Sequence, residues 1–440
     1  MKPTVDVKTV IDQSHVNPFH IKLLITFIII TMFDGYDMFY LGNIIPSLIQ
    51  DWGITTTTAG ILMSSGLVGM ALGAVILGMV ADRMGRRFTV SFAIFTFSIF
   101  TFIASFAVEP IFFAICRFLA GLGLGGVIPV LNASLGEFLP KKRRIAIVTL
   151  VNIGAPIGGM LTSLTAIYIL PHFGWRPVLW IGSLPLFLIP FVLKVLPNSP
   201  EYNFRNRQFE KLSDVLNKIT GKNIYNANDF KYTFTSQNVK NQSSVKSLFT
   251  DKRAVSTLLF WVAVFMNLVA LYGLSTWIPS IMVQAGYSLT LGISFLLILK
   301  LGAIVGAVIG GGFTNRFNAK FVIVVYFIVG FIALIILGLK PPFIISYILL
   351  FISGAATNGT QMLMNSYIAQ FYPTHIKATG TGWSIGIGRI GGIVSPIIGG
   401  LILSSIAMPY IVNFLLFAIP CFIAAISFFY VQEKYSVFRA

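Results

Sequence analysis

Long apolar runs separated by short polar stretches make up almost the whole chain. A membrane-spanning helix needs about 20 mainly apolar residues. Runs of about this length predict twelve spans, at residues 19–49, 57–80, 88–108, 110–136, 145–168, 176–195, 255–283, 290–313, 320–338, 343–370, 378–404 and 408–431. A longer polar stretch separates the sixth span from the seventh. The pattern predicts an all-α membrane protein with an amino-terminal six-helix bundle (1–196), a linker (197–254) and a carboxy-terminal six-helix bundle (255–440).

An internal repeat relates the two predicted bundles. When the chain is compared with itself at a shift of 233 residues, Ile45–Ser47 matches Ile278–Ser280, and the string GAVI at 73–76 matches GAVI at 306–309. The register holds without a gap over five spans. Two homologous, pseudo-symmetric halves in parallel orientation, with a site between them at the middle of the membrane, are the architecture of an alternating-access transporter.

The basic residues set the expected orientation. The short connections after spans 2, 4, 8 and 10, which all face the same side of the membrane, are rich in them, whereas only Arg176 and Lys340 lie near span ends on the opposite side. Because basic residues concentrate on the cytoplasmic side, we expect a multi-pass protein of the bacterial inner membrane with both termini and residues 197–254 in the cytoplasm. The net charge of +17 is then a topology signal. No nucleic-acid partner is expected, because the charges are scattered over loop ends.

The composition agrees with a membrane protein. The chain is 56% hydrophobic and only 10% charged, with a mean hydropathy of +0.85, which excludes an ordinary soluble protein. Residues 1–18 are polar and predict no cleaved signal peptide. Cys116 and Cys421 lie inside predicted spans, so neither a disulfide framework nor a cysteine metal site is indicated. We expect no cofactor and no metal.

Two aspartates interrupt the first apolar run. Asp34 and Asp37 are three residues apart, so on a helix they share a face. An ionised side chain at the centre of a span costs about 2.5–3.5 kcal/mol, and two like charges one turn apart repel each other. We therefore expect at least one carboxyl to be protonated near neutral pH and the pair to titrate as a coupled unit. This behaviour suits a proton carrier. A structural role, with hydrogen bonds from neighbouring helices, is the alternative.

The second half carries buried positive charge and no negative charge to balance it. No Asp or Glu occurs between Asp251 and Glu433, whereas Lys300 and Arg389 lie deep inside spans 8 and 11. Arg389 cannot lose its proton, and its planar guanidinium suits a carboxylate. We expect it to contact a substrate carboxylate, or else to form a structural pair with one of the aspartates. Lys300 either lines the anion path or has a local role.

Further residues are candidates for the substrate site. Arg117 lies inside span 4, where it either faces the cavity or bonds to neighbouring helices. Asn365, the repeat counterpart of Asn132, is also expected to contact the substrate. For the substrate ring, depth alone selects Tyr36 and Trp383, with Phe33, Tyr40 and Trp277 as further aromatic candidates.

The connection after span 2 predicts a gate. Its sequence GMVADRMGRRF (78–88) places several basic residues near Glu137 at the end of span 4. An Arg–Glu contact at this place suggests a latch that holds the cytoplasmic side shut in one state. The expected gate residues are Gly78, Asp82, Arg83, Arg86, Arg87 and Glu137. The alternative is that these charges only set the topology.

These motifs resemble known ones. Residues 78–87 are similar to the G-x-x-x-D-R-x-G-R-R signature of the major facilitator superfamily. The D-G-x-D pattern at 34–37 and the stretch YPTHIKATGTGWSIGIGRIGG at 372–392 resemble the aromatic acid:proton symporter family, and the opening VIDQSHVNPFH is most similar to its benzoate-transporter members. The chain departs from the family with IPV at 128–130 in place of MPN and PNSPE at 197–201 in place of PESP.

The resemblance implies the superfamily's fold and the uptake of a benzoate-like acid together with protons. It implies that Asp34 and Asp37 are needed for transport, that Arg389 contacts the substrate, and that Asp82, Arg86 and Glu137 belong to the gate.

From these features we expect a monomeric symporter and not an enzyme. It would import a small aromatic carboxylate with protons by alternating access while embedded in membrane lipids. The alternatives are a symporter for another small organic anion, such as muconate or a hydroxycinnamate, and a drug:proton antiporter, which the two buried cations disfavour. A sensor or membrane enzyme would need an additional domain, and residues 197–253 are too few for one.

Overall fold

The computed structural model describes residues 3–234, 245–314, 316–373, 376–404 and 409–436. Within these residues, twelve helical segments are long and apolar enough to cross a membrane. They are Pro18–Trp52, Thr56–Met84, Arg86–Ala104, Pro110–Phe138, Ala146–Phe173, Arg176–Val195, Ala254–Gln284, Leu289–Thr314, Ala319–Gly338, Phe343–Phe371, Lys377–Leu403 and Tyr410–Phe429. The predicted number of spans and the all-helical class are confirmed.

Nine of these segments are single helices: α2 (Pro18–Trp52), α3 (Thr56–Met84), α4 (Arg86–Ala104), α5 (Pro110–Phe138), α12 (Ala254–Gln284), α13 (Leu289–Thr314), α14 (Ala319–Gly338), α17 (Lys377–Leu403) and α18 (Tyr410–Phe429). The other three are interrupted. The fifth comprises α6 (Arg144–Asn152) and α7 (Gly154–Phe173), and the sixth α8 (Arg176–Ser183), the 3₁₀ turn η1 (Leu184–Leu188) and α9 (Ile189–Val195). The tenth comprises α15 (Phe343–Gly354), the π-helical turn η3 (Ala355–Gly359) and α16 (Thr360–Phe371).

Several span ends differ from the prediction by a few residues, and two of them show why. The third helix ends at Ala104, not at 108, because a turn precedes Pro110, where α5 begins. The fifth span continues to Phe173, past the predicted end at 168, although Pro171 and His172 lower the local hydropathy. Hydropathy reports burial in lipid, and it does not register where the backbone turns.

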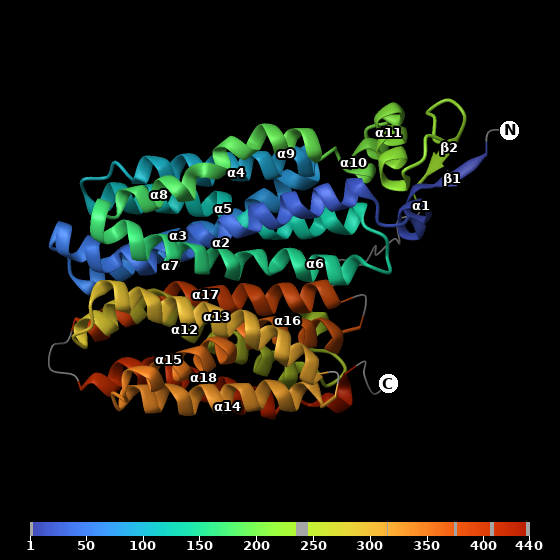
Figure 1. The fold of residues 1–440 in the computed structure, drawn as a ribbon. Helices are drawn as coiled ribbons and strands as arrows, with labels where there is room; N and C mark the ends of the chain where they lie inside the picture. Colours follow the sequence, from blue (N-terminus) through green and yellow to red (C-terminus); the bar gives the residue numbers. More distant parts are fainter. Residues whose placement is uncertain (1–2, 235–244, 315, 374–375, 405–408, 437–440) are drawn as a thin grey trace.

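Two bundles lie side by side (Figure 1). One contains α2 to α9, the other α12 to α18, and both described ends of the chain lie at the same end of the molecule. We call this the inner end and the opposite one the outer end.

The packing within the bundles follows the sequence repeat. A Cβ at Gly69 of α3 would overlap the Phe118 carbonyl of α5, and a Cβ at Gly302 of α13 would overlap the Phe351 carbonyl of α15. Under the shift of 233 residues, Gly69 corresponds to Gly302 and Phe118 corresponds to Phe351. Glycine therefore allows the same close helix approach in both halves.

The repeat also relates the residues where the halves meet. A Cβ at Gly42 of α2 would overlap the Ser275 carbonyl of α12. These two residues are equivalent under the same shift of 233. Two equivalent positions can touch only close to the axis that relates them, so the pseudo-two-fold axis passes near this contact.

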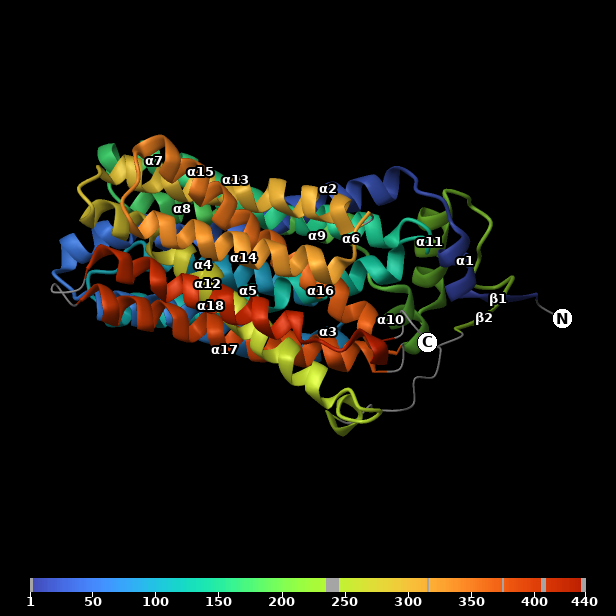
Figure 2. The ribbon, with the colours of Figure 1, turned by 90° about the horizontal axis from the view of Figure 1, so that it is seen from below.

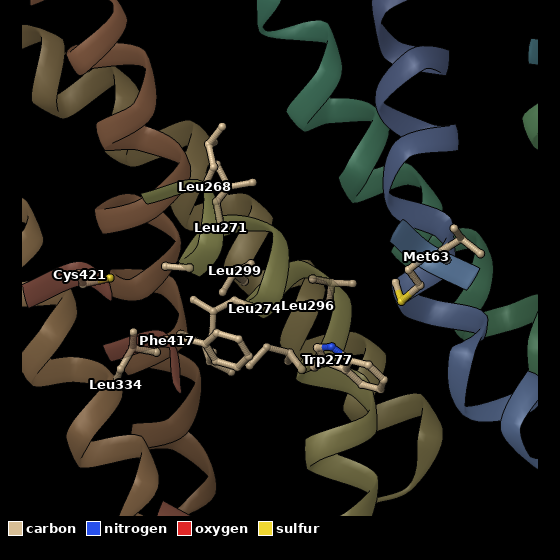
Figure 3. Packing of buried hydrophobic residues seen from close by; sticks show 14 of the residues in the cluster. Met63, Leu268, Leu271, Leu274, Trp277, Leu296, Leu299, Leu334, Phe417 and Cys421 are labelled. Atoms are coloured by element: carbon tan, nitrogen blue, oxygen red, sulfur yellow. The ribbon is translucent and has the colours of Figure 1, made fainter. Parts of the chain in front are cut away.

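The halves are joined mainly towards the outer end. One apolar cluster includes residues from both halves, such as Met63 of α3 and Leu271 and Trp277 of α12 (Figure 3). A second cluster, from Val7 to Tyr232, belongs to the amino-terminal half and the residues that follow it.

The inner ends of α3 and α17 lie apart. Three hydrogen bonds join these helices, from Thr56 to the Gly400 carbonyl, from Ser64 to the Ile393 carbonyl and from Arg389 to the Met70 carbonyl. All three lie in the outer part of α3 or at its middle.

Glycines on the same helix faces confirm the separation. At about 100° per residue, Gly78 of α3 and both Gly382 and Gly386 of α17 continue the faces that meet further out. A Cβ at any of the three would have no neighbour within 4 Å. The structure is therefore closed at the outer end and open at the inner end.

A small cap covers the inner end of the first half (Figure 2). Strand β1 (Thr4–Asp6) pairs in parallel with β2 (Lys231–Thr233), with Thr4 opposite Lys231. Beside them lie α1 (Val7–Gln13), α10 (Pro200–Arg205) and α11 (Phe209–Thr220). Apart from the cap, the described residues include two short 3₁₀ turns, η2 (Val245–Leu248) and η4 (Glu433–Tyr435). The linker thus has a folded portion.

Candidate functional site

Asp34 is a buried carboxyl without a hydrogen-bond partner in the described part of the chain. It lies in the middle of α2 and is fully buried, and neither of its carboxylate oxygens has a hydrogen bond to the described residues. The next residue, Gly35, allows the backbone of Ala155 in α7 to approach so closely that a Cβ would overlap it. An unpaired carboxylate is costly in such a place. Asp34 is stable there when it holds a proton or when a cation compensates its charge.

A cation that acts on Asp34 comes from the other half. Arg389 of α17 interacts electrostatically with Asp34 and with Tyr272 of α12. Its guanidinium donates a hydrogen bond to the Met70 carbonyl across the interface, at 3.2 Å. Within the described residues no carboxylate lies at ion-pair distance from it. Because the bond to Met70 is the innermost between α3 and α17, Arg389 lies where the closed outer part meets the inner opening.

Asp37 has a different environment from Asp34. Its carboxylate accepts hydrogen bonds from Thr101 at 2.6 Å and from Arg117 at 2.8 Å. Arg117 also donates to the Tyr40 hydroxyl at 2.9 Å. All four residues belong to the first half and are buried. In this conformation Arg117 therefore bonds to a neighbouring helix, and Asp37 is neutralised by an ion pair.

Lys300 is a second cation from the other half, and it is buried whereas Arg389 is half-buried. Its ammonium group donates to the Ser275 hydroxyl at 2.7 Å and lies 3.2 Å from the centre of the Phe39 ring in α2. No ion pair joins it to a carboxylate in the described part of the chain. The attraction of a cation to an aromatic face is strong when both are desolvated. Lys300 thus connects α13 to α2 beside the interface.

A small cavity lies next to these cations. Its lining includes Phe39, Met70, Arg117, Tyr272 and Ser275, and its volume is about 20 Å³. This is room for about one water molecule and far too little for an aromatic ring. An organic substrate would have to occupy the inner opening.

The structure does not bring Tyr36 or Trp383 to Asp34. The Tyr36 hydroxyl bonds to Thr165 at 2.9 Å and to the Val178 carbonyl at 3.2 Å, inside the first half. It lies about 200° around α2 from Asp34 at 100° per residue. Trp383 is 45% exposed and stacks on Trp261 near the inner end of the second half.

The structure also shows what the other three aromatic candidates contact. Tyr40 bonds to Arg117, and the Trp277 indole donates to the Pro396 carbonyl at 3.1 Å. The Phe33 ring lies 6.5 Å from that of Tyr36. Depth along the chain selected these residues, but the direction in which each side chain points depends on the packing.

Asn365 belongs to an amide cluster that the sequence analysis did not identify. Asn267 of α12 donates to Gln361, and Gln361 donates to Asn365. A signal for this cluster is present in the sequence, because Asn267 is the repeat counterpart of Asp34 and Gln361 is an isolated polar residue in an apolar span.

Three of the residues expected to form the gate are in contact. Arg86 bonds to Asp82 at 3.2 Å and to Glu137 at 3.1 Å. All three residues belong to the first half, so in this conformation the contacts hold its own helices together and do not cross to the second half. Gly85, between α3 and α4, has a φ of +87°, which favours glycine.

The remaining gate candidates lie apart from this contact. Arg87 donates to the Leu193 carbonyl, Arg83 is exposed, and Gly78 faces open space. No group of three or more His, Cys, Asp or Glu residues suited to a metal ion occurs in the described residues.

Comparisons with known proteins identify the family. A profile of the Major Facilitator Superfamily matches residues 27–393 and 301–439. The chain is 35% identical over 439 residues to a benzoate transport protein of Acinetobacter baylyi, covering 99% of this chain and 94% of that one. It is 31% identical over 431 residues to a gallate transporter of Pseudomonas putida, covering 96% and 94%.

A solved structure agrees on the fold. The inward open conformation of a xylose transporter from E. coli superposes with a TM-score of 0.75 at 15% identity, covering 93% of this chain and 96% of that one. At this identity the likeness concerns the fold alone. The chain belongs to the Major Facilitator Superfamily: it is a membrane transporter and not an enzyme, and it is related to transporters of aromatic acids.

Proposed function

We propose that the protein is a proton-coupled symporter that imports a benzoate-like aromatic carboxylate. In this proposal Arg389 holds the substrate carboxylate and Asp34 carries the proton. The observation that carries it is a fully buried carboxyl without hydrogen-bond partners among the described residues. This carboxyl interacts electrostatically, across the two halves, with an arginine that has no ion-paired carboxylate in the same part of the chain. The names of the relatives support the substrate class.

The coupling follows from the balance of charges. One guanidinium compensates about one carboxylate in a low-dielectric site. When a substrate carboxylate binds to Arg389, Asp34 would lie beside a second negative charge. Two neighbouring negative charges repel each other, which favours protonation of one of the two carboxylates. Substrate and proton therefore bind together. Their joint release at the inner end leaves Asp34 and Arg389 to compensate each other while the empty site returns.

The direction of transport follows from the membrane potential. A monoanion that enters a negative interior is opposed by about 2.3 kcal/mol per 100 mV. One accompanying proton cancels this cost, and two protons make the potential a driving force. We place the inner end, with both termini and the cap, in the cytoplasm, because the basic connections lie there.

The same proposal assigns the remaining parts. Residues 1–196 and 255–440 move as two bundles, and residues 197–254 link them. The contact of Arg86 with Asp82 and Glu137 keeps the inner ends of the first half aligned for closure. We further propose that the unit of transport is one chain.

Uptake into proteoliposomes tests the function. Purified protein is reconstituted with an acidic outside and an alkaline inside, and the initial rate of labelled benzoate entry is measured. Because neutral benzoic acid also diffuses through lipid, protein-free liposomes give the background. We expect a saturable rate above this background that a protonophore abolishes.

A matched pair of variants ties the rate to the site. Arg389→Leu should reduce the protein-dependent rate at least tenfold, whereas Arg316→Leu, at an exposed arginine of the second half, should leave it unchanged. If benzoate, hydroxybenzoates, cinnamates and muconate all enter at the background rate, the proposed substrate class is wrong. Expulsion of a lipophilic cation in exchange for protons would favour an antiporter instead.

A further inference from the structure

Lys300 is a buried cation that the proposed mechanism does not use. It is 1% exposed, and its one hydrogen bond within the described residues goes to Ser275, although an ammonium group can donate more than one. No carboxylate in the described part of the chain forms an ion pair with it. An ionisable residue inside a span is costly to keep and usually marks the path of an ion or a substrate. The cost of this charge points to a role beyond packing.

The sequence repeat shows that packing does not require a cation at this position. Under the shift of 233 residues, Lys300 corresponds to Leu67 and Phe39 corresponds to Tyr272. Leu67 and Tyr272 line the same small cavity in the first and second halves. The fold therefore accepts an apolar side chain at the equivalent position, and the charge is particular to the second half.

The side chain of Lys300 crosses from the second half to the first. Its ammonium group lies 3.2 Å from the centre of the Phe39 ring in α2, and a Cβ at Gly159 of α7 would lie 3.4 Å from its Cδ. Both of these neighbours belong to the first half, whereas Ser275 belongs to α12 of the second. When the halves separate at this depth, Lys300 keeps Ser275 and leaves Phe39.

This contact lies in the closed outer part of the interface. Phe39 follows Asp34 on α2, which runs from the inner to the outer end, and it lies about 7.5 Å farther out at 1.5 Å per residue. Ser275 is the residue whose carbonyl meets Gly42 near the pseudo-two-fold axis. Alternating access requires this part of the interface to open. The ammonium group of Lys300 then loses its aromatic partner and is exposed to the outer opening.

We propose that Lys300 is the first contact of the substrate carboxylate in the outward-open conformation. Its ammonium group binds the carboxylate while the outer end is open. On closure the Phe39 ring replaces the carboxylate as the partner of the desolvated cation, and the substrate passes inward to Arg389. This inference rests on the proposed function, in which Arg389 holds the carboxylate in the inner opening.

Substrate affinity measured from each side of the membrane tests this exchange of partners. Right-side-out and inverted membrane vesicles are loaded with unlabelled benzoate, and the entry of labelled benzoate in exchange gives the KM at the outer and the inner face. Vesicles without the protein give the background. Lys300→Met removes the charge and keeps the length of the side chain. It should raise the outer KM about tenfold or more, the effect of losing a hydrogen bond to a charged group.

A variant of the aromatic partner separates this role from a structural one. Phe39→Leu breaks the same contact between the halves but keeps the ammonium group. It should leave the outer KM unchanged or lower it, because the ammonium group can still bind the carboxylate. If Lys300 only held the outer end closed, both variants would shift the outer KM in the same direction. The inner KM should change equally in the two variants.

A matched lysine provides the control. Lys434 also lies over an aromatic ring, that of Tyr435, but it is exposed at the inner end of the second half. Lys434→Met should therefore change neither KM. If Lys300→Met does not reach the membrane, Lys300→Leu, which copies the residue at the equivalent position of the first half, has the same expected result.

The outcomes are distinct. A raised outer KM in Lys300→Met but not in Phe39→Leu supports the inference. An outer KM that is unchanged or lowered in Lys300→Met, or that shifts equally in both variants, overturns it. If the parent protein exchanges neither benzoate nor a hydroxybenzoate above the background, the proposed function fails instead.

Discussion

At the scale of single residues, two aspartates one helical turn apart have different surroundings. Asp37 is held by Thr101 and Arg117, while Asp34 has no hydrogen-bond partner in the described chain. The difference arises because their side chains point about 60° apart around α2, at 100° per residue. Asp37 thereby faces α4 and α5, and Asp34 faces the interface. The two carboxyls look equivalent in the sequence, but in the structure one is ion-paired and the other has no hydrogen-bond partner among the described residues.

The ion pair predicts a stability effect. Asp37→Asn leaves the Arg117 guanidinium buried without its counter-charge, so the free energy of unfolding should fall by about 3–5 kcal/mol. Asp251→Asn is the matched control, because Asp251 pairs with Arg253 while it is 68% exposed, and this change should cost less than about 1 kcal/mol. Thermal unfolding in detergent measures both. The double variant Asp37→Asn/Arg117→Leu should regain part of the lost stability. If Asp37→Asn were as stable as Asp251→Asn, the ion pair between Asp37 and Arg117 would be refuted.

The sequence identified most of the residues that carry charge, but not their partners. Comparison of the two halves singled out Asp34 and Arg389, because unbalanced charge inside a span is visible in the sequence. The sequence left open whether Arg117 faces the cavity or another helix. Tyr36 was selected by depth alone, whereas its angle around the helix already places it away from Asp34. The direction of Trp383 depends on its contact with Trp261, which no local pattern predicts.

At the scale of helices, paired glycines set the distances between them. Gly302 of α13 lies against the Phe351 carbonyl, as Gly69 of α3 does against Phe118. The repeat in the sequence predicted the equivalence of these positions. It could not predict which glycines make close contacts, because others in the same helices face open space.

This contrast gives a prediction within one helix. Gly302→Ala should lower the free energy of unfolding by about 1–3 kcal/mol, because the added methyl group forces α13 and α15 apart. Gly312→Ala in the same helix has no neighbour within 4 Å and should be neutral or stabilising by up to about 1 kcal/mol, the helix propensity gained. Unfolding followed by circular dichroism distinguishes them. A greater loss in Gly312→Ala would contradict the packing.

The cap illustrates the limit of prediction from local pattern. Helix α11 has apolar residues at Phe209, Leu212, Leu216 and Ile219, the spacing of an amphipathic helix. The sequence pattern is therefore sufficient to predict this helix. The pairing of β1 with β2 joins residues more than 200 positions apart in three-residue strands, and so short a pattern predicts no partner.

At the scale of the whole molecule, the arrangement of contacts explains how one site can serve two sides. The halves meet at the outer end through α3 and α17 and near the pseudo-two-fold axis at Gly42 and Ser275, and they separate at the inner end. Twelve spans and the repeat were readable from the sequence because lipid imposes length and apolarity on each helix. The sequence does not indicate which end is open, because the conformation open at the inner end and the one open at the outer end use the same helices.

The central claim is that the proton is carried by Asp34 and the carboxylate is held by Arg389. Its most direct test is Asp34→Asn in proteoliposomes, with two modes of transport compared in one preparation. The first is uphill accumulation of labelled benzoate, driven by an acidic exterior. The second is exchange of labelled for unlabelled substrate without any gradient. Asp251→Asn serves as the control.

If Asp34 carries the proton, Asp34→Asn loses protein-dependent uphill accumulation but keeps exchange within about threefold of the parent rate, because the neutral amide imitates the protonated carboxyl and Arg389 still binds the substrate. Accumulation at the parent level in Asp34→Asn would show that the proton travels elsewhere and would contradict the mechanism.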